Sequence, residues 1–104
     1  MPKITVLAVA LAALVVGANA SAAGDAAAGK SKAATCVACH GPNGNSTNPL
    51  WPKLAGQHAA YLEKQLKAFK SGERKDPLMS PMAASLSPKD IEDIAAYFAS
   101  QKQN

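Results

Sequence analysis

The residues best suited to chemistry are Cys36, Cys39 and His40, which form the pattern Cys-x-x-Cys-His. Two thiols separated by two residues on a helical turn can each add across one vinyl group of a haem and form a thioether. The histidine that follows then lies beneath the porphyrin, where its imidazole can bind the iron axially. The pattern therefore predicts covalent haem attachment through both cysteines, with His40 as an iron ligand.

Three other interpretations of the cysteine pair are weaker. A disulfide between them would close a very small loop, and the stability gained from a disulfide grows with loop length. A thioredoxin-like redox pair is expected beside a strand in a βαβ unit, which this sequence does not indicate. A structural zinc site needs four ligands. His58 could complete such a set, but the loop composition is not typical of a zinc site.

The second axial position of the iron decides what such a site does. The candidates are Met79, Met82 and His58. Both methionines lie in or beside a segment with prolines at 77 and 81, which we expect to be a loop that encloses the haem. His58 precedes an amphipathic helix and is expected to be exposed. Methionine and histidine together raise the reduction potential and leave no open position for a substrate, so this ligand set predicts an electron carrier.

Two other functions stay open from the residues alone. With a vacant sixth position the iron would be free to bind a gas or a peroxide, and the protein would be a gas-binding protein or an enzyme. The domain could also be a module held in a larger respiratory complex. Nucleic-acid binding is not indicated, because the formal charge of +4 over 104 residues is not concentrated in a basic stripe.

A helix over residues 25–35 is predicted to lead into the cysteine motif, with Asp25 as its N-cap. Gly29 lies inside this segment and costs a helix about 1 kcal/mol relative to alanine. We therefore expect another element to pack closely against that face. Residues 41–52 are dense in Gly, Pro, Asn and Ser, which predicts a loop.

Two further helices are predicted. Residues 59–70 place Leu62, Leu66 and Phe69 on one apolar stripe, and residues 73–81 are expected to be a loop. The last helix follows Ser87 as N-cap, with Pro88 in the first helical position. Its apolar stripe comprises Ile91, Ile94, Ala95 and Phe98. No segment alternates with a period of two, so the predicted fold is all-α, with three main helices and long loops.

Residues 1–22 are predicted to be a secretory signal peptide. Lys3 gives a cationic start, residues 4–16 are mostly apolar, and small residues follow. The apolar run is shorter than the roughly 20 residues that a membrane-spanning helix needs, so an uncleaved anchor is less favoured. Cleavage is expected after Ala22, with Ala20 as the alternative. Residues 23–104 then form one small domain with few large side chains, in which a haem would supplement the core.

The chain resembles a class I cytochrome c, and more narrowly a single domain of the cytochrome c4 and small bacterial c5/c553 group. The matching stretches are 36–41 (CVACHG), 51–57 (WPKLAGQ), 61–66 (YLEKQL), 79–82 (MSPM), 86–87 (LS) and 93–98 (DIAAYF). They cover nearly all of the domain, in the same order and spacing. The resemblance implies the cytochrome c fold around one covalent haem with a partly exposed edge. It also implies N- and C-terminal helices that cross at a right angle, with Gly29 against Tyr97 or a neighbour.

The resemblance also implies a choice between the methionines. In the c4-like arrangement the ligating methionine lies eight residues before the serine that caps the last helix, which is Met79; Met82 remains the alternative. Pro52 resembles the loop proline near the proximal histidine, and Trp51 matches an aromatic residue beside the haem. The c4 proteins carry two such domains, whereas this sequence has one attachment motif. We therefore expect a monohaem protein or one half of a noncovalent pair.

On this resemblance we expect a periplasmic single-electron carrier, not an enzyme, whose iron cycles between Fe(II) and Fe(III). Its partners would be redox proteins: a terminal oxidase, a reductase or a cytochrome bc1-type donor. The basic residues expected around the haem edge are Lys53, Lys64, Lys67, Lys70, Arg74 and Lys75. They would either steer acidic partners or form an ordinary solvated surface.

Overall fold

The computed structural model describes residues 2–6, 8 and 24–104, and this part of the chain contains helices and no strands. The helices are α1 (Ala26–Lys32), the 3₁₀ turn η1 (Ala33–Thr35), α2 (Val37–His40), the 3₁₀ turn η2 (Pro42–Gly44), α3 (Ala59–Ser71), α4 (Met79–Ala84) and α5 (Pro88–Ala99). The all-α prediction is confirmed for these residues. None of their helices has the length and apolar character that crossing a membrane requires. Most of the predicted signal peptide, residues 1–22, lies outside the described residues.

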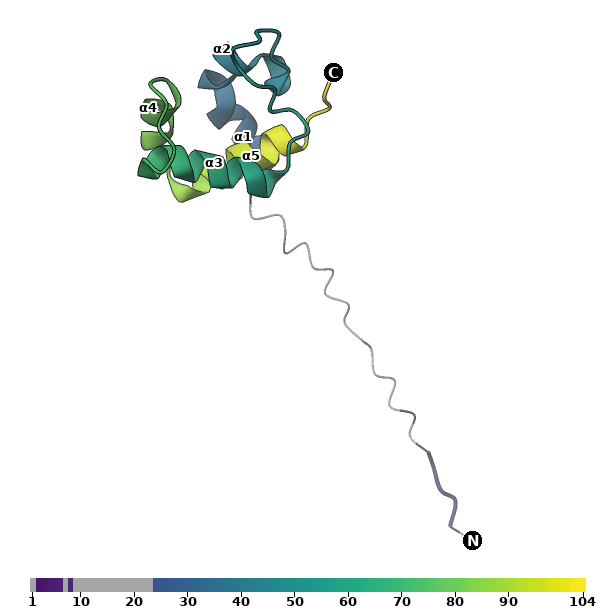
Figure 1. Cartoon of the computed structure of the whole chain (residues 1–104). Helices are drawn as coiled ribbons and strands as arrows, with labels where there is room; N and C mark the ends of the chain where they lie inside the picture. Colours follow the sequence, from purple (N-terminus) through teal and green to yellow (C-terminus); the bar gives the residue numbers. More distant parts are fainter. Residues whose placement is uncertain (1, 7, 9–23) are drawn as a thin grey trace.

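The first and last helices pack directly on one another, and Figure 1 shows α1 against α5. A Cβ atom added to Gly29 would lie 1.9 Å from the carbonyl oxygen of Asp93 and 2.9 Å from the Cβ of Tyr97. The predicted close packing at Gly29 is therefore confirmed. The two backbones approach so closely that no side chain fits between them.

A buried carboxylate joins the same two helices. Asp93, on α5, is 1% exposed, and its Oδ1 accepts a hydrogen bond from the backbone N–H of Asp25 at 2.8 Å. The ammonium groups of Lys32 and Lys89 lie 2.7 and 2.9 Å from its two oxygens. These contacts, the Asp25 amide first, hold the pKa of Asp93 well below its usual value. Asp25 also caps α1 with its own side chain, as predicted.

The ends of α3 and α5 follow from the sequence. Ser87 Oγ accepts from the backbone N–H of Asp90, and the Asp90 carboxylate accepts from that of Ser87, which closes a capping box at the start of α5. The predicted stripe of this helix, Ile91, Ile94, Ala95 and Phe98, is buried. The helix predicted over 59–70 extends one residue further, to Ser71, and ends at Gly72 with a left-handed φ of 82°.

Two predicted boundaries are wrong. The helix expected over 25–35 changes to a 3₁₀ turn at Ala33 before α2 begins. The loop expected over 73–81 ends early, because α4 begins at Met79. Pro81 is compatible with this helix, since it lies in the first turn, where a backbone N–H has no intrahelical partner. Met79 and Met82 therefore lie on a short helix and not on a loop.

Candidate haem-binding site

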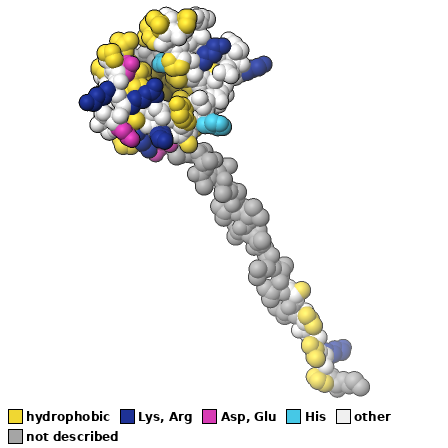
Figure 2. Space-filling view, in the orientation of Figure 1, with side chains coloured by type: hydrophobic (Ala, Val, Ile, Leu, Met, Phe, Trp, Pro, Cys, Tyr) yellow, Lys and Arg dark blue, Asp and Glu magenta, His cyan; other side chains and the backbone are white. Residues whose placement is uncertain are grey.

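A cavity of about 800 Å³ is lined by residues from α2, α3, α4 and α5 and from the loop that follows η2. The space-filling view shows hydrophobic side chains gathered around the hollow in this face, with Lys and Arg side chains near its margin (Figure 2). Cofactor pockets typically have volumes of about 300–1,000 Å³ and mostly apolar walls. Buried core residues Leu62, Ile94 and Phe98 contribute to its walls, so the cavity reaches the centre of the domain.

All four predicted cofactor-binding residues line this cavity: Cys36, Cys39, His40 and Met79. Met82, the alternative ligand, also lines it, and it is 41% exposed. Trp51 and Pro52 are part of the wall, as the resemblance implied. His58 is not among the lining residues; it is exposed at the start of α3, as expected.

His40 is buried, and one of its ring nitrogens has a fixed partner. Its Nδ1 lies 2.8 Å from the carbonyl oxygen of Pro52. A carbonyl oxygen only accepts, so Nδ1 carries a proton, and in the neutral imidazole Nε2 has the lone pair that a metal would bind. Metal-binding histidines commonly use one nitrogen for the metal and the other for such a second partner. The resemblance placed Pro52 near the histidine, but no sequence pattern indicated this hydrogen bond.

A tight turn follows the histidine. Gly41 has a φ of 79°, and a Cβ atom there would lie 2.5 Å from the carbonyl oxygen of Asn45. Glycine adopts this φ without the steric cost of a side chain. The turn lets the chain leave α2 at once and return along the cavity to Pro52.

The two cysteines lie on one helical turn, as the motif predicted. The backbone N–H groups of Cys39 and His40 both donate to the carbonyl oxygen of Cys36, at 3.2 and 2.9 Å. Both thiols are free; Cys36 is partly buried and Cys39 is exposed. Burial raises the pKa of the Cys36 thiol. Both thiols therefore lie on the cavity wall, spaced along one turn.

Met79 is the first residue of α4, and Asp76 holds the backbone around it. The Asp76 carboxylate accepts from the backbone N–H groups of Leu78 and Met79, at 2.9 and 2.8 Å. These two bonds, the one from Met79 first, lower the pKa of Asp76. Asp76 was not among the predicted site residues. An aspartate followed by a proline is a common helix start and was the available signal.

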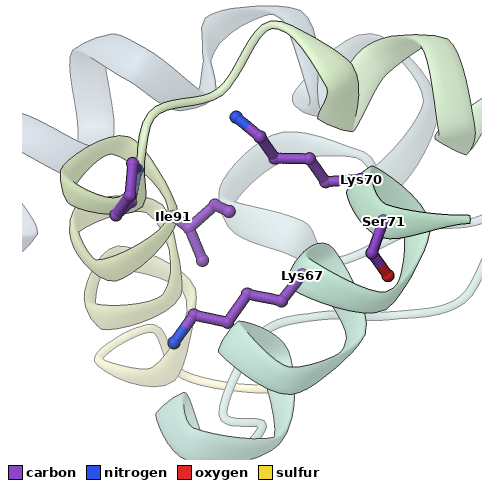
Figure 3. Close-up of a pocket in the computed structure, with 5 residues that line it drawn as sticks. Lys67, Lys70, Ser71 and Ile91 are labelled. Atoms are coloured by element: carbon purple, nitrogen blue, oxygen red, sulfur yellow. The ribbon is translucent and has the colours of Figure 1, made fainter. Parts of the chain in front are cut away.

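The basic residues predicted to surround the haem edge do not lie together in the structure. Lys53 and Arg74 line the haem-sized cavity, whereas Lys67 and Lys70 line a different pocket of about 430 Å³ between α3 and α5. Figure 3 shows Ile91 between the side chains of Lys67 and Lys70 in this second pocket. Lys70 Nζ donates to the carbonyl oxygen of Leu86. Lys64 and Lys75 are exposed and line neither pocket.

Arg74 is fixed beside the cavity by two contacts. Its guanidinium carbon lies 4.5 Å from the centre of the Phe69 ring, and one of its nitrogens donates to Oε1 of Gln65 at 2.7 Å. A guanidinium stacked on an aromatic ring loses little freedom when it meets a carboxylate. Arg74 is therefore a preorganised positive charge at the cavity edge.

The residues present fit a covalently bound haem. The cavity supplies apolar walls, two thiols on one turn, an imidazole with a free Nε2 and a thioether sulfur from another helix. Figure 1 shows α2 and α4 apart, with α3 and α5 below them. A histidine and a methionine from separate elements can bind one iron from two sides.

Comparison with known proteins identifies the same group of proteins. The family model for cytochrome c matches residues 26–102. The chain is 55% identical to cytochrome c-554(548) of Halomonas halodenitrificans over 83 residues, which are 77% of this chain and 100% of that protein. It is 56% identical to cytochrome c4 of Pseudomonas aeruginosa over 82% of this chain and 42% of that protein.

A solved structure agrees with these matches. The crystal structure of cytochrome c4 from Pseudomonas stutzeri superposes with a TM-score of 0.74 at 51% identity, over 78% of this chain and 47% of that one. The chain thus spans the full length of the Halomonas protein but less than half of the cytochrome c4 proteins.

Proposed function

Because the chain belongs to the cytochrome c family and is a haem-based electron carrier, we propose that it binds a single haem in the cavity described above. Cys36 and Cys39 form the two thioether bonds, each by addition of its S–H across one vinyl group. His40 and Met79 would supply the two side-chain ligands of the iron. When bound, the haem supplies a metal that gains or loses one electron without a change of ligands.

The observation that supports this proposal most strongly is the fixed His40 imidazole. Its Nδ1–H is bonded to the Pro52 carbonyl oxygen at 2.8 Å, so the ring presents Nε2 without reorganisation. Met79 lines the same cavity from α4. With His40 and Met79 both bound to the iron, no position on it would be open to a substrate. The protein is therefore an electron-transfer protein and not an enzyme.

We also propose the compartment in which the protein acts and the class of its partners. Residues 1–22 act as a signal peptide, and residues 23–104 act in the periplasm. Electrons pass to and from redox proteins of a respiratory chain, such as a terminal oxidase, a reductase or a cytochrome bc1-type donor. The partner docks where Lys53 and Arg74 lie beside the cavity.

A visible spectrum of the purified holoprotein tests the ligand set. The oxidised protein is expected to show the weak far-red band of a methionine–iron bond, and Met79→Ala should abolish it. Met82→Ala is the matched control and should keep the band. A band that survives in Met79→Ala and disappears in Met82→Ala contradicts the choice of Met79. Rapid binding of carbon monoxide by the native ferrous protein contradicts the closed ligand set altogether.

A further inference from the structure

Hydrogen bonds to the side chain and backbone of Asp76 hold the short segment that carries Met79. The Asp76 carboxylate accepts from the backbone N–H groups of Leu78 and Met79. In return, the backbone N–H of Asp76 donates to Oγ of Ser80 at 3.0 Å, and the backbone N–H of Ser80 donates to the carbonyl oxygen of Asp76 at 3.0 Å. Four bonds thus fix the backbone from 76 to 80.

The rest of α4 does little to hold Met79 in place. The helix has six residues, and isolated helices shorter than about 12 residues are marginal in water. Pro81 contributes no backbone N–H, and the bond from the Met82 N–H to the Leu78 carbonyl oxygen is long, at 3.4 Å. The Asp76 bonds are therefore the direct hydrogen-bond restraint on the Met79 backbone N–H, in addition to the packing of α4 on α3.

The side chain of Met79 cannot supply this restraint itself. Methionine has three rotatable bonds and adapts to many environments, so its sulfur is placed accurately only if its backbone is fixed. Charged acceptors form stronger hydrogen bonds than neutral ones. A carboxylate that binds the N–H of the ligand residue directly is well suited to this task.

We infer that Asp76 is a positioning residue: through its hydrogen bonds to Leu78 and Met79, it keeps the Met79 sulfur at the distance and angle that iron ligation requires. This inference rests on the proposed function, because it takes Met79 as the ligand. It assigns a role to a residue that does not itself touch the iron. The role is geometric: it requires an acceptor oxygen at this position, and the charge of the carboxylate strengthens the bonds.

The test compares Asp76→Ala with Asp76→Asn in the holoprotein. The asparagine variant keeps a side-chain carbonyl oxygen that can accept both N–H groups, and it should keep the far-red band. The alanine variant has no acceptor and should lose most of the band. The reduction potential should fall in Asp76→Ala, since loss of methionine ligation lowers it. In Asp76→Asn it should stay equal or rise, because a negative charge near the iron has been removed.

Amide hydrogen exchange in the ferrous holoprotein gives a second readout. Exchange of the Met79 N–H should be about tenfold faster or more in Asp76→Ala, as expected for loss of a bond to a charged acceptor. Asp90→Ala is the matched control, because Asp90 caps α5 in a similar way. It should lower thermal stability and leave the band and the Met79 exchange rate unchanged.

The outcomes separate the inference from the proposed function. A band retained in Asp76→Ala but lost in Met79→Ala overturns the role of Asp76 alone. A band retained in Met79→Ala overturns the ligand assignment, and the role of Asp76 with it. If Asp76→Ala does not fold, Ser80→Ala, which removes only the acceptor of the Asp76 N–H, should still weaken the band and speed Met79 exchange. No change in either quantity overturns the inference.

Discussion

The hydroxyl of Tyr97 donates a hydrogen bond to Oδ1 of Asn43 at 2.9 Å. Tyr97 is buried on α5, and Asn43, with a left-handed φ of 56°, lies on η2 three residues after His40. This bond ties the turn that follows the histidine to the C-terminal helix. The position of His40 is thus supported from two directions, by Pro52 across the loop and by α5 through Asn43.

A double-mutant cycle measures this link. Tyr97→Phe removes the donor, and Asn43→Gly removes the acceptor while keeping a residue that tolerates the positive φ. We expect a coupling free energy of about 0.5–1.5 kcal/mol, the usual net value of a hydrogen bond. Denaturant unfolding of the four holoproteins gives this quantity. A coupling of zero means that the bond contributes nothing to stability.

Single serine substitutions test the covalent attachment. Cys36→Ser and Cys39→Ser should each retain one thioether, so that denaturing mass spectrometry still finds haem bound to the chain. The double variant should release its haem under the same conditions, because no thiol remains to form a thioether. Covalent haem in the double variant contradicts the attachment sites.

Gly29→Ala tests the contact between α1 and α5. The new methyl group would overlap the Asp93 carbonyl oxygen, so we expect a loss of about 1–3 kcal/mol or more in the free energy of unfolding. Ser31→Ala, an exposed change on the same helix, should stay within about 0.5 kcal/mol of the native protein. Equal effects of the two substitutions contradict the close packing.

The pH dependence of stability tests the buried Asp93. Its pKa is lowered in the folded protein, so below the ordinary aspartate pKa of about 3.9 the unfolded state binds more protons. The stabilisation is therefore complete above about pH 4–5 and declines as the pH falls below that range. Thermal unfolding from pH 7 to pH 2 should show this decline, and Asp93→Asn should reduce its slope. Asp90→Asn should reduce it less, because Asp90 is less buried.

Ionic strength tests the role of the positive charges beside the cavity. If Lys53 and Arg74 steer an acidic partner, the second-order rate of electron transfer should fall steeply between low salt and about 0.15 M, where the Debye length is about 8 Å. Replacing both with glutamine should flatten this dependence. Lys64→Gln, a substitution of an exposed lysine away from both pockets, is the control. A rate independent of salt shows that these charges do not steer.

Helices that bury a regular stripe and have capping residues were predictable from the sequence. α3 and α5 each have an apolar stripe of helical period and residues that mark their ends. Gly29 predicted the close contact between helices, because a glycine inside a helix indicates that another element packs against it. α4 was missed because six residues show no periodicity and because prolines before it and within it, at positions 77 and 81, are typical of loops. Its start depends on hydrogen bonds to Asp76, and it packs against the preceding helix α3.

The residues of the site also differ in how far the sequence alone predicted them. Cys36, Cys39 and His40 are neighbours in the sequence, so their spacing was sufficient to predict them. Met79 needed the resemblance, because several residues could have bound the iron. The bond from His40 to Pro52 joins a side chain to a backbone atom twelve residues away. Every residue has a backbone carbonyl oxygen. The residue type at position 52 therefore does not predict this hydrogen bond.

The contact of α1 with α5 has a consequence for the order of assembly. α1 has seven residues, too few to be stable alone in water, and its packing partner α5 is far from it in the sequence. Until α5 is in place, α1, which leads into the segment with both thiols, lacks the helix on which it packs. A haem attached to these thiols before α1 and α5 pack together would therefore meet an open chain, and the packing of the two helices would complete the fold afterwards.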